Sequence, residues 1–407
     1  MKSILLFLLT ALVLSCSSGA EKSEIKPQKK EDPFMQKLPL IDITVRLYDN
    51  SFASAGMIYL ADSGWLKEPA PMKKDGAWMT VTVTNIKELR FYFRIDGAKW
   101  YPSNNAASAY RTTLAEVWIK DGIIYPYDPV KGEKPAGMFD VLTLNLHTYQ
   151  EKDPLAKLGY VAETIAKADA DFVAFQECAQ HSSSNKAAEW YGVTIRSDNM
   201  AKIITDTLKK KYSQEYNVFW DWAHYGWGVW EEGVAVLSKK SYPMKSPQSQ
   251  YISQQTAKNS IDSRMAAMSY FDMPGVGLLR FVSVHVSWGG VQSAQLAALN
   301  EWAKYSSEAP GIFLICGDFN MNFDTPGYKQ MTEEYLYTDA YRASNPGGKA
   351  DGTTSGSRID YQFLIGKTIV PVLAQRLFTG APDWDAAFKQ VSDHYGVLVW
   401  YKVTSEK

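Results

Sequence analysis

The spacing of apolar residues changes at the segment YDPVKGEKPAG, residues 127–137. Before this segment, short runs alternate apolar and polar residues between turn clusters, as in IDITVRLY (41–48), WMTVTVTN (78–85), LRFYFRI (89–95) and EVWIKDGIIY (116–125). After it, apolar runs of strand length interleave with segments of helical periodicity. Because strands and helices have different periods, these patterns predict two domains, and 407 residues suffice for both. We place the domains at 37–129 and 138–405, joined by a linker at 130–137.

The first domain is predicted to be an antiparallel β-sandwich, because several short strands with turn signals and no helical period are typical of that architecture. It resembles a small carbohydrate-binding or immunoglobulin-like module. Its conspicuous aromatic residues are Trp65, Trp78, Trp100, Tyr101, Tyr110 and Trp118. Such rings can stack on a glycan or can form the core of the sandwich, and the sequence leaves both interpretations open.

The second domain alternates predicted strands and helices. Strands are expected at 139–146, 171–177, 231–241, 264–271, 278–286, 312–319, 358–365 and 395–402, and helices at 153–170 and 291–307. Some strands follow each other directly, whereas others are separated by a helix. This order predicts an α/β domain whose sheets are flanked by helices.

The first 36 residues are predicted to lie outside both domains. Residues 1–16 combine Lys2 with an apolar run that is too short for a permanent membrane span, which is typical of a signal peptide. Leu-Ser-Cys before Ser-Ser-Gly resembles a bacterial lipobox, so Cys16 is expected to carry lipid and to anchor an exported protein in the periplasm or on the cell surface. A plain secretory signal is the alternative. Residues 17–36 are polar and predict a flexible tether.

Net charge and cysteine content exclude some binding partners and some kinds of fold. The formal net charge is −1, so no global positive field attracts nucleic acid or an anionic membrane. Beyond Cys16 the chain contains only Cys178 and Cys316, which rules out a disulfide framework. Whether these two cysteines form a bridge is left open.

Polar residues recur at the ends of the apolar runs in the second domain: Asn145, Glu177, His285, Asp318, Asn320, Asp360, Asp393 and His394. Any one of them can be a structural residue, such as a strand terminator or a hydrogen-bonded core histidine. Together they predict one polar site where loops converge at one edge of a sheet. The oxygens of Asn145, Glu177 and Asp393 suit a hard cation such as Mg²⁺.

The other members of this set supply the remaining parts of phosphoester hydrolysis. Asp318 can orient or deprotonate a water molecule, and Asn320 can donate to a phosphoryl oxygen. His285 and His394 can donate to the charge that develops on the phosphate. Asp360 can hold the ring of His394 and raise its pKa.

The order of the motifs resembles the endonuclease/exonuclease/phosphatase superfamily, also called deoxyribonuclease I-like, over residues 138–403. The motifs are LTLNLHT, VAFQE, EEGVAVLS, SVHVSW, CGDFNMN, RIDYQF and SDHYGV. The resemblance implies a four-layer α/β sandwich and a phosphoesterase that uses Mg²⁺, with Mn²⁺ or Ca²⁺ as alternatives. It also implies a glutamate hydrogen-bonded to the first histidine of the site, for which we favour Glu232 over Glu231. Arg264 lies where relatives can place a phosphate-contacting arginine, although a surface arginine is an equal alternative.

The superfamily includes nucleases, sphingomyelinases and phosphatases, so the fold does not choose the substrate. The strings NLHTYQE and WDWAHYGWGVWEEG are similar to a bacterial branch that includes a maltose-phosphate phosphatase. The second string contains Trp220, Trp222, Trp227 and Trp230, which can stack on a sugar or a base or can form a buried cluster.

We therefore expect a small phosphorylated substrate, with sugar phosphates among the candidates. A secreted deoxyribonuclease I-like nuclease ranks second. A sphingomyelinase or phospholipase C-type phosphodiesterase ranks third, because no loop reads as an exposed apolar hairpin. A non-catalytic glycan-binding surface protein is the alternative from another class. We expect membrane contact only through the lipid on Cys16, and no obligate protein partner.

Overall fold

A computed structural model describes residues 37–48, 52–103, 108–305, 311–349, 351–382 and 385–404. The predicted signal peptide with Cys16 and the predicted tether at 17–36 lie outside these ranges. Within them, no helix is long and apolar enough to cross a membrane.

The N-terminal module consists of two packed sheets. Its strands are β1 (Ile41–Tyr48), β2 (Ala55–Ala61), β3 (Gly64–Trp65), β4 (Ala70–Pro71), β5 (Lys73–Asp75), β6 (Trp78–Ile86), β7 (Leu89–Ile95), β8 (Lys99–Tyr101), β9 (Tyr110–Thr112), β10 (Glu116–Lys120) and β11 (Ile123–Tyr125). One sheet has the order β11-β10-β1-β6-β5, and the other contains β3-β2-β7-β8 with β4 and β9 attached. The expectation of a purely antiparallel sandwich is wrong at one pair, because β1 and β10 are parallel. The chain passes through the second sheet between these strands and so re-enters the first sheet in the direction of β1.

The aromatic residues of the module divide into two groups. Three are buried in the core: Trp78, Tyr101 and Tyr110. Three are partly exposed: Trp65, Trp100 and Trp118. The guanidinium groups of Arg90 and Arg94 lie over the rings of Trp65 and Trp100, at 5.5 and 5.4 Å from the ring centroids. Three of the six rings therefore form part of the core of the module. Glycan binding by the other three stays a prediction.

The second domain contains two six-stranded sheets, which confirms the predicted α/β class. The first sheet has the order β16-β17-β13-β12-β25-β24. Its strands are β12 (Met138–Asn145), β13 (Phe172–His181), β16 (Tyr216–Gly226), β17 (Trp230–Lys239), β24 (Ile369–Leu377) and β25 (Gly396–Val403). The second has the order β18-β19-β20-β21-β23-β22. Its strands are β18 (Lys245–Tyr251), β19 (Met265–Met273), β20 (Gly277–His285), β21 (Ile312–Asp318), β22 (Thr338–Asp339) and β23 (Asp360–Ile365).

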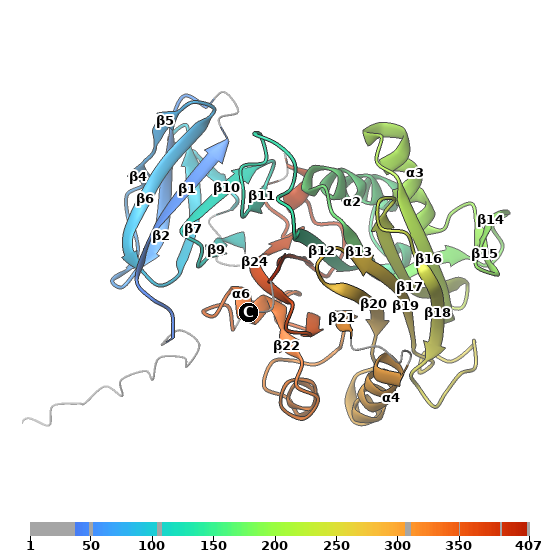
Figure 1. Ribbon diagram of the computed structural model, residues 1–407. Helices are drawn as coiled ribbons and strands as arrows, with labels where there is room; N and C mark the ends of the chain where they lie inside the picture. The colour runs from blue at the N-terminus through green and yellow to red at the C-terminus, as the bar shows by residue number, and fades with distance from the viewer. Residues whose placement is uncertain are drawn as a thin grey trace, which may run out of the picture.

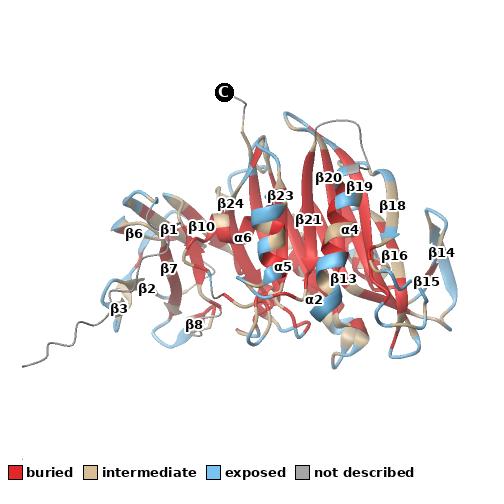
Figure 2. Ribbon diagram, turned by 90° about the horizontal axis from the view of Figure 1, so that it is seen from below, coloured by how far each residue is buried: buried red, intermediate tan, exposed pale blue. Residues whose placement is uncertain are grey.

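Helices complete a four-layer sandwich. Figure 1 shows α2 (Pro154–Ala168) and α3 (Met200–Tyr212) outside the first sheet and α4 (Gln292–Tyr305) outside the second. The shorter helical segments are η2 (His147–Tyr149), η3 (Gly289–Val291), α5 (Pro326–Lys329), η4 (Gln330–Glu334), α6 (Ala340–Ser344) and η5 (Ala386–Phe388), and β14 (Lys186–Trp190) pairs with β15 (Val193–Arg196). The central strands of both sheets are almost wholly buried, whereas the edge strands β16 and β18 are largely intermediate or exposed (Figure 2). Between them Phe172 of the first sheet contacts Phe271 and Phe281 of the second, with ring centroids 5.0 and 5.5 Å apart.

The module and the second domain share one continuous core. Phe388 packs against Tyr101 of the module at a centroid distance of 5.5 Å, and the Tyr101 hydroxyl donates to Asp385 at 2.9 Å. In the predicted linker, Lys134 forms buried ion pairs with Asp140 and Asp171. The segment between the domains is therefore anchored to the second domain, so the module is held in a fixed position against it.

The two cysteines do not form a bridge. Cys178 and Cys316 are both buried free thiols. Cys178 belongs to the core that includes α2 and α3, whereas Cys316 belongs to the core between the two sheets. The sequence left open whether Cys178 and Cys316 are bonded, and the structure shows that they are not.

Candidate active site

Strand register brings three of the predicted residues into one row. β20 and β21 are parallel, and His285 is the partner of Asp318 at their carboxyl ends. β23 runs antiparallel to β21, so Asp360 at its beginning is the partner of Asp318 on the other side. In the first sheet, Asn145 is the partner of Gln176, next to Glu177. The predicted residues therefore lie at strand ends in both sheets.

Unusual backbone geometry shapes the site. Gly317 has a φ of 153°, and a Cβ atom there would lie 1.9 Å from the carbonyl oxygen of Val284, so the motif CGDFN requires glycine. Asn320 and Glu177 have φ values of 48° and 45°, which non-glycine residues rarely adopt. Glu177 lies in a bulge of β13 between Phe175 and Cys178. Strained residues of this kind are concentrated at functional sites.

Two carboxylates face each other across the amide of Asn145. Its Nδ2 donates to Glu177 Oε1 at 2.9 Å and to Asp318 Oδ2 at 3.1 Å. Burial, together with the negative charge of Glu232, raises the pKa of Glu177 to about 8. Burial, together with the charge of Asp360, raises the pKa of Asp318 to about 7. Both carboxyl groups therefore lie in an environment with too little positive charge.

This donor set fits a divalent cation. Ligand atoms of Glu177, Asp318 and His285 all lie within 4.8 Å of one another. The two carboxylates of this group suit Mg²⁺ or Mn²⁺, and a cation would offset the repulsion between the acids. The sequence predicts that Asn145 gives a side-chain oxygen to the metal. In the structure, that oxygen, Oδ1, instead accepts the backbone N–H of His147 at 2.9 Å.

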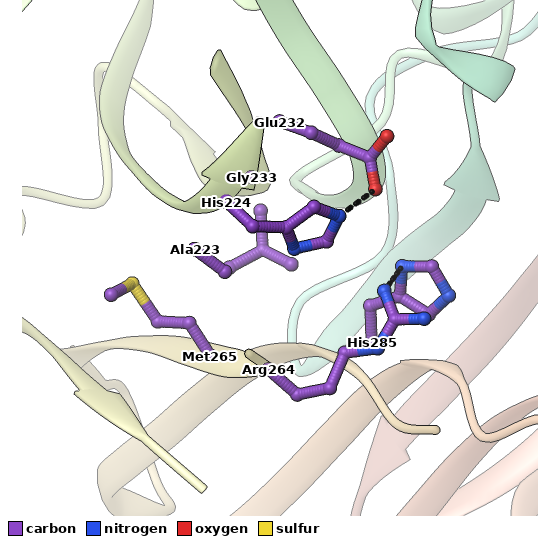
Figure 3. A pocket seen from close by; sticks show the side chains of 8 residues that line it. Ala223, His224, Glu232, Gly233, Arg264, Met265 and His285 are labelled. Carbon is purple, nitrogen blue, oxygen red and sulfur yellow. Dashed lines mark hydrogen bonds and ion pairs between the residues drawn. The ribbon is translucent and has the colours of Figure 1, made fainter. Parts of the chain in front are cut away.

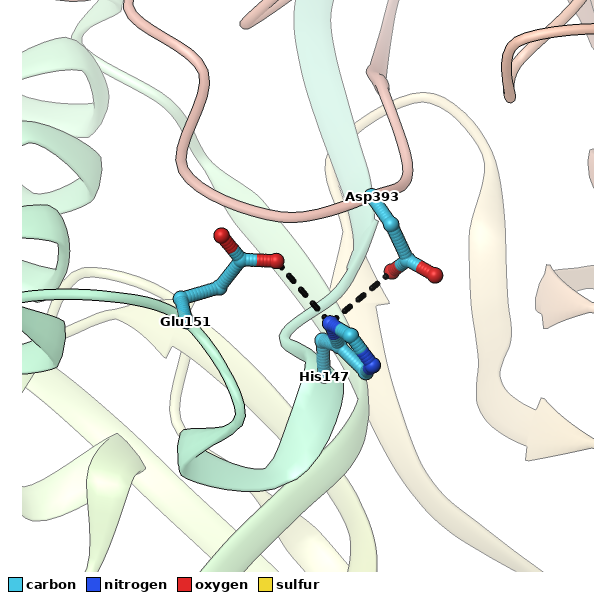
Figure 4. Close-up of side chains that lie close together, drawn as sticks. All are labelled: His147, Glu151 and Asp393. Atoms are coloured by element: carbon cyan, nitrogen blue, oxygen red, sulfur yellow. Dashed lines mark hydrogen bonds and ion pairs between the residues drawn. The ribbon is translucent and has the colours of Figure 1, made fainter.

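The structure separates Asp393 from this cation site. Among the described residues, its carboxylate groups with His147 and Glu151, and not with Glu177. The Nδ1 atom of His147 lies 3.3 Å from Asp393 and 2.9 Å from Glu151 (Figure 4). The Asp393 side chain is 55% exposed. The expectation that it shares a metal with Glu177 is therefore wrong for this geometry, and the three residues form a second candidate metal group.

His394 has the partner that the sequence predicted. Its Nδ1 lies 2.9 Å from Asp360 Oδ2, and its Nε2 lies 3.7 Å from Asp318 Oδ2. Burial would lower the pKa of the imidazole, but the carboxylate of Asp360 outweighs it and raises the pKa to about 10. His394 is therefore protonated at neutral pH and directs its Nε2 into the site.

His285, Asn320 and Arg264 form the opposite wall. Asn320 Nδ2 lies 3.2 Å from His285 Nε2. Arg264 Nη1 lies 3.4 Å from His285 Nδ1 (Figure 3). Burial and the charge of Arg264 lower the pKa of His285 well below its usual value. Arg264 itself is only 3% exposed, so the surface alternative is wrong for this residue. The wall therefore combines a neutral imidazole, an amide and a guanidinium, a set that suits a phosphate.

Glu232 contacts a histidine other than the expected one. Its Oε1 lies 3.3 Å from Nε2 of His224 (Figure 3). Its Oε2 accepts from the Thr148 hydroxyl at 2.7 Å. The expected hydrogen bond to His285 is therefore not formed. The physical reason is strand pairing, since His224 on β16 is the partner of Glu232 on β17. Glu231 instead pairs with Arg196, outside the site.

Comparison with known proteins agrees with this geometry. The sequence model of the endonuclease/exonuclease/phosphatase family matches residues 142–394, well over half of the chain. The chain belongs to this family. The comparison with curated proteins gave no match.

Solved structures of endonuclease/exonuclease/phosphatase proteins share the fold. A family protein from Leptotrichia buccalis is 22% identical, with 65% of this chain and 99% of that chain covered and a TM-score of 0.55. A family protein from Bacteroides thetaiotaomicron is 16% identical, with coverages of 66% and 96% and a TM-score of 0.50. The catalytic domain of human nocturnin is 15% identical, with the same coverages and a TM-score of 0.50. Members of the family are hydrolases that act on phosphoester bonds, and they generally depend on a divalent metal.

The endonuclease/exonuclease/phosphatase site opens into a cavity of about 400 Å³. Glu177, Arg264 and His285 line its inner part, and Trp227, Ile261 and Trp288 line its mouth. These three apolar side chains are 57%, 58% and 60% exposed. Trp220, by contrast, is fully buried, and Trp222 and Trp230 are partly buried, so only Trp227 of the four clustered tryptophans lies open at the cavity.

Several residues in or beside the candidate site escaped sequence reasoning. They are His147, Thr148, Glu151, His224 and Trp288. His147 and Thr148 do carry a signal, because they follow a strand directly. His224 was visible only as a member of an aromatic string, and its role depends on the register of β16 against β17.

Proposed function

We propose that the protein is a divalent-metal-dependent phosphoester hydrolase that acts on a small phosphorylated substrate. The observation that carries the proposal is the row formed by His285, Asp318 and Asp360, with His394 behind Asp360 and Glu177 opposite. This row combines an acid poised near neutral pH, a protonated imidazole and a cation-binding carboxylate within one site.

The chemical tasks of this proposal are divided among the row and the residues around it. Asp318 accepts a proton from the attacking water, for which a pKa of about 7 is well matched. His394 donates from Nε2 to a phosphoryl oxygen, while Arg264 and Asn320 hold the phosphate from the other side. A cation held by Glu177 would withdraw charge from the phosphate and would orient it. The His147, Glu151 and Asp393 group is available for a second cation.

Removal of metal is expected to abolish turnover, because the phosphate would lose the group that withdraws its charge and orients it. Chelator-treated protein should regain activity with Mg²⁺, and Mn²⁺ and Ca²⁺ should be compared with it. The measurement is product release from a panel of hexose phosphates, nucleotides, DNA, RNA and sphingomyelin. Full activity in excess chelator would contradict the metal assignment. Failure to hydrolyse any panel member with any of the three cations would refute the phosphoesterase proposal.

The cavity mouth supports a small substrate with a ring or another apolar face. Trp227 and Trp288 offer exposed aromatic rings next to the phosphate site, and the Arg264 guanidinium lies over the Trp288 ring, 5.7 Å from its centroid. Arg264 is the only cation among the described residues that line the cavity. Because a polynucleotide needs cations for its flanking phosphates, a nuclease ranks second.

One observation favours the third candidate, a lipid phosphodiesterase. Trp227 and Val229 are 57% and 40% exposed in the turn between β16 and β17. The sequence did not suggest an exposed apolar hairpin, yet this turn is one. Sphingomyelin in the panel, together with cosedimentation of the protein with sphingomyelin vesicles, separates this candidate from the first.

Replacing Trp227 or Trp288 by alanine is expected to raise KM for ring-bearing substrates about tenfold, because stacking on one aromatic ring contributes roughly 1–3 kcal/mol. The kcat value should change little, and methyl phosphate, which has no ring, should be turned over as before. The matched control is Tyr191→Ala, which removes an aromatic ring that is also 57% exposed but does not line this cavity. Equal KM values in all variants would show that the rings do not bind substrate.

A further inference from the structure

A buried arginine of the N-terminal module reaches into the catalytic domain. Arg111 Nε and Nη2 donate to the two carboxylate oxygens of Asp351 at 2.7 and 3.2 Å. Its Nη1 donates to Glu88 of the module at 2.9 Å. Glu88 in turn accepts the backbone N–H of Gly347 at 3.0 Å. Arg111 thus fixes the beginning of the loop at 351–359 from outside the catalytic domain.

This loop is attached to the catalytic pair through one residue. The Thr353 hydroxyl accepts the backbone N–H groups of Ile359 and Asp360, each at 3.1 Å. The Thr353 carbonyl accepts the N–H of Tyr395 at 2.6 Å. Asp360 and Tyr395 lie on different segments, and Tyr395 follows His394 directly. Thr353 therefore holds together the two segments that supply the pair of Asp360 and His394.

Further hydrogen bonds and ion pairs fix Asp351 and the residue after it in place. Arg376 donates to the carbonyl of Gly352 at 2.9 Å, and Tyr341 donates to Asp351 at 2.9 Å. Burial would raise the pKa of Asp351, but the charges of Arg376 and Arg111 outweigh it and lower the pKa to about 2. The carboxylate therefore stays ionised at any physiological pH. A two-point contact between guanidinium and carboxylate fixes direction as well as distance.

We propose that Arg111 is a positioning residue for the active site, acting through Asp351 and Thr353 on the pair of Asp360 and His394. The inference rests on the proposed function, because it assigns a role to a pair that the function uses. It makes the N-terminal module a part of the catalytic unit. A buried ion pair is weak evidence for stability but can specify one geometry, and here that geometry is the 2.9 Å contact between Asp360 and His394.

Three variants test this role. Arg111→Lys retains the positive charge but cannot make the two-point contact. Thr353→Val retains the shape of the side chain but removes the hydroxyl that accepts from Asp360. The control is Tyr101→Phe, which removes a buried hydrogen bond to Asp385 in the same domain interface, away from the loop. We expect kcat to fall about tenfold in Arg111→Lys and in Thr353→Val, with KM within twofold of wild type. Tyr101→Phe should retain kcat within twofold.

A second readout does not require activity. Hydrogen–deuterium exchange of full-length protein should become at least tenfold faster at the amides of Asp360 and Tyr395 in Arg111→Lys, but not in Tyr101→Phe. Melting temperatures show whether each variant is folded. If Arg111→Lys is folded and matches the control in both kcat and exchange, the positioning role is refuted while the proposed function stands. If wild type hydrolyses no phosphoester, the proposed function fails, and faster exchange in Arg111→Lys would still show the anchor.

Discussion

Replacing Asp318 by asparagine is expected to lower kcat at least a thousandfold, which corresponds to about 4 kcal/mol of transition-state stabilisation. The change retains the size of the side chain but removes the group that accepts the proton from water. Its raised pKa and its place between His285 and His394, each 3.7 Å away, suit a general base at neutral pH. The measurement is kcat on the best substrate of the panel.

The melting temperature of Asp318→Asn should equal or exceed that of wild type, because the change removes one of two repelling buried carboxyl groups. Asp324→Asn is the matched control, since Asp324 lies six residues further along the same segment and is exposed. It should retain full activity. An Asp318→Asn variant with more than a tenth of wild-type kcat would remove Asp318 from the role of base.

The α/β class and the row of catalytic residues could be predicted because both depend on local pattern, whereas the four-layer arrangement was implied by the family resemblance. Strand period places His285, Asp318 and Asp360 at strand ends, and strand ends of one sheet meet at one edge. The pairing of His394 with Asp360 does not follow from strand period, because Asp360 begins β23 of the second sheet and His394 precedes β25 of the first. Side-chain chemistry and the family resemblance suggested it, although Asp393 is nearer in sequence. Adjacent residues at a strand entrance point in different directions, so sequence neighbours are poor candidates for partners.

The incorrect predictions concern features that depend on strand register and on tertiary contacts, which no local sequence pattern encodes. Glu232 and His224 meet because of the register of β16 against β17, and a shift of two residues would have given Glu232 a different partner. Asp393 leaves the cation site because His147, on a short helical segment after β12, attracts it. The parallel pairing of β1 and β10 likewise depends on where the chain returns from the second sheet.

The anchor at Arg111 shows a further limit of sequence reasoning. Arg111 and Asp351 are 240 residues apart, and nothing around either residue marks it as functional. The predicted division into module and catalytic domain treated the module as a separate binding unit. Shared core and buried ion pairs indicate that it also supports the active site, so truncation at the linker is a poor way to obtain the catalytic domain.

Replacing Asp360 by asparagine is expected to lower kcat about a hundredfold and to move the alkaline limb of the pH profile down by at least two units. The sign follows from the charge of Asp360, which holds the pKa of His394 near 10 against the opposing effect of burial. Wild-type activity should therefore persist until the pH rises through that value, because protonated His394 is the donor. Without the Asp360 carboxylate, only the weaker effects of Asp318 and Asp393 still oppose burial, so the pKa of His394 falls and the imidazole loses its proton at a lower pH than in wild type. The measurement is kcat from pH 5 to 10.

A double variant decides whether Asp360 acts through His394 or independently of it. If it acts through His394, Asp360→Asn combined with His394→Gln should be no less active than His394→Gln, because the second change removes the group on which Asp360 acts. Multiplied losses would mean that Asp360 has a separate task, such as repelling Asp318 to raise its pKa. That result would leave the hydrolase proposal intact but would break the path from Arg111 to the phosphate, since the path ends in the contact between Asp360 and His394.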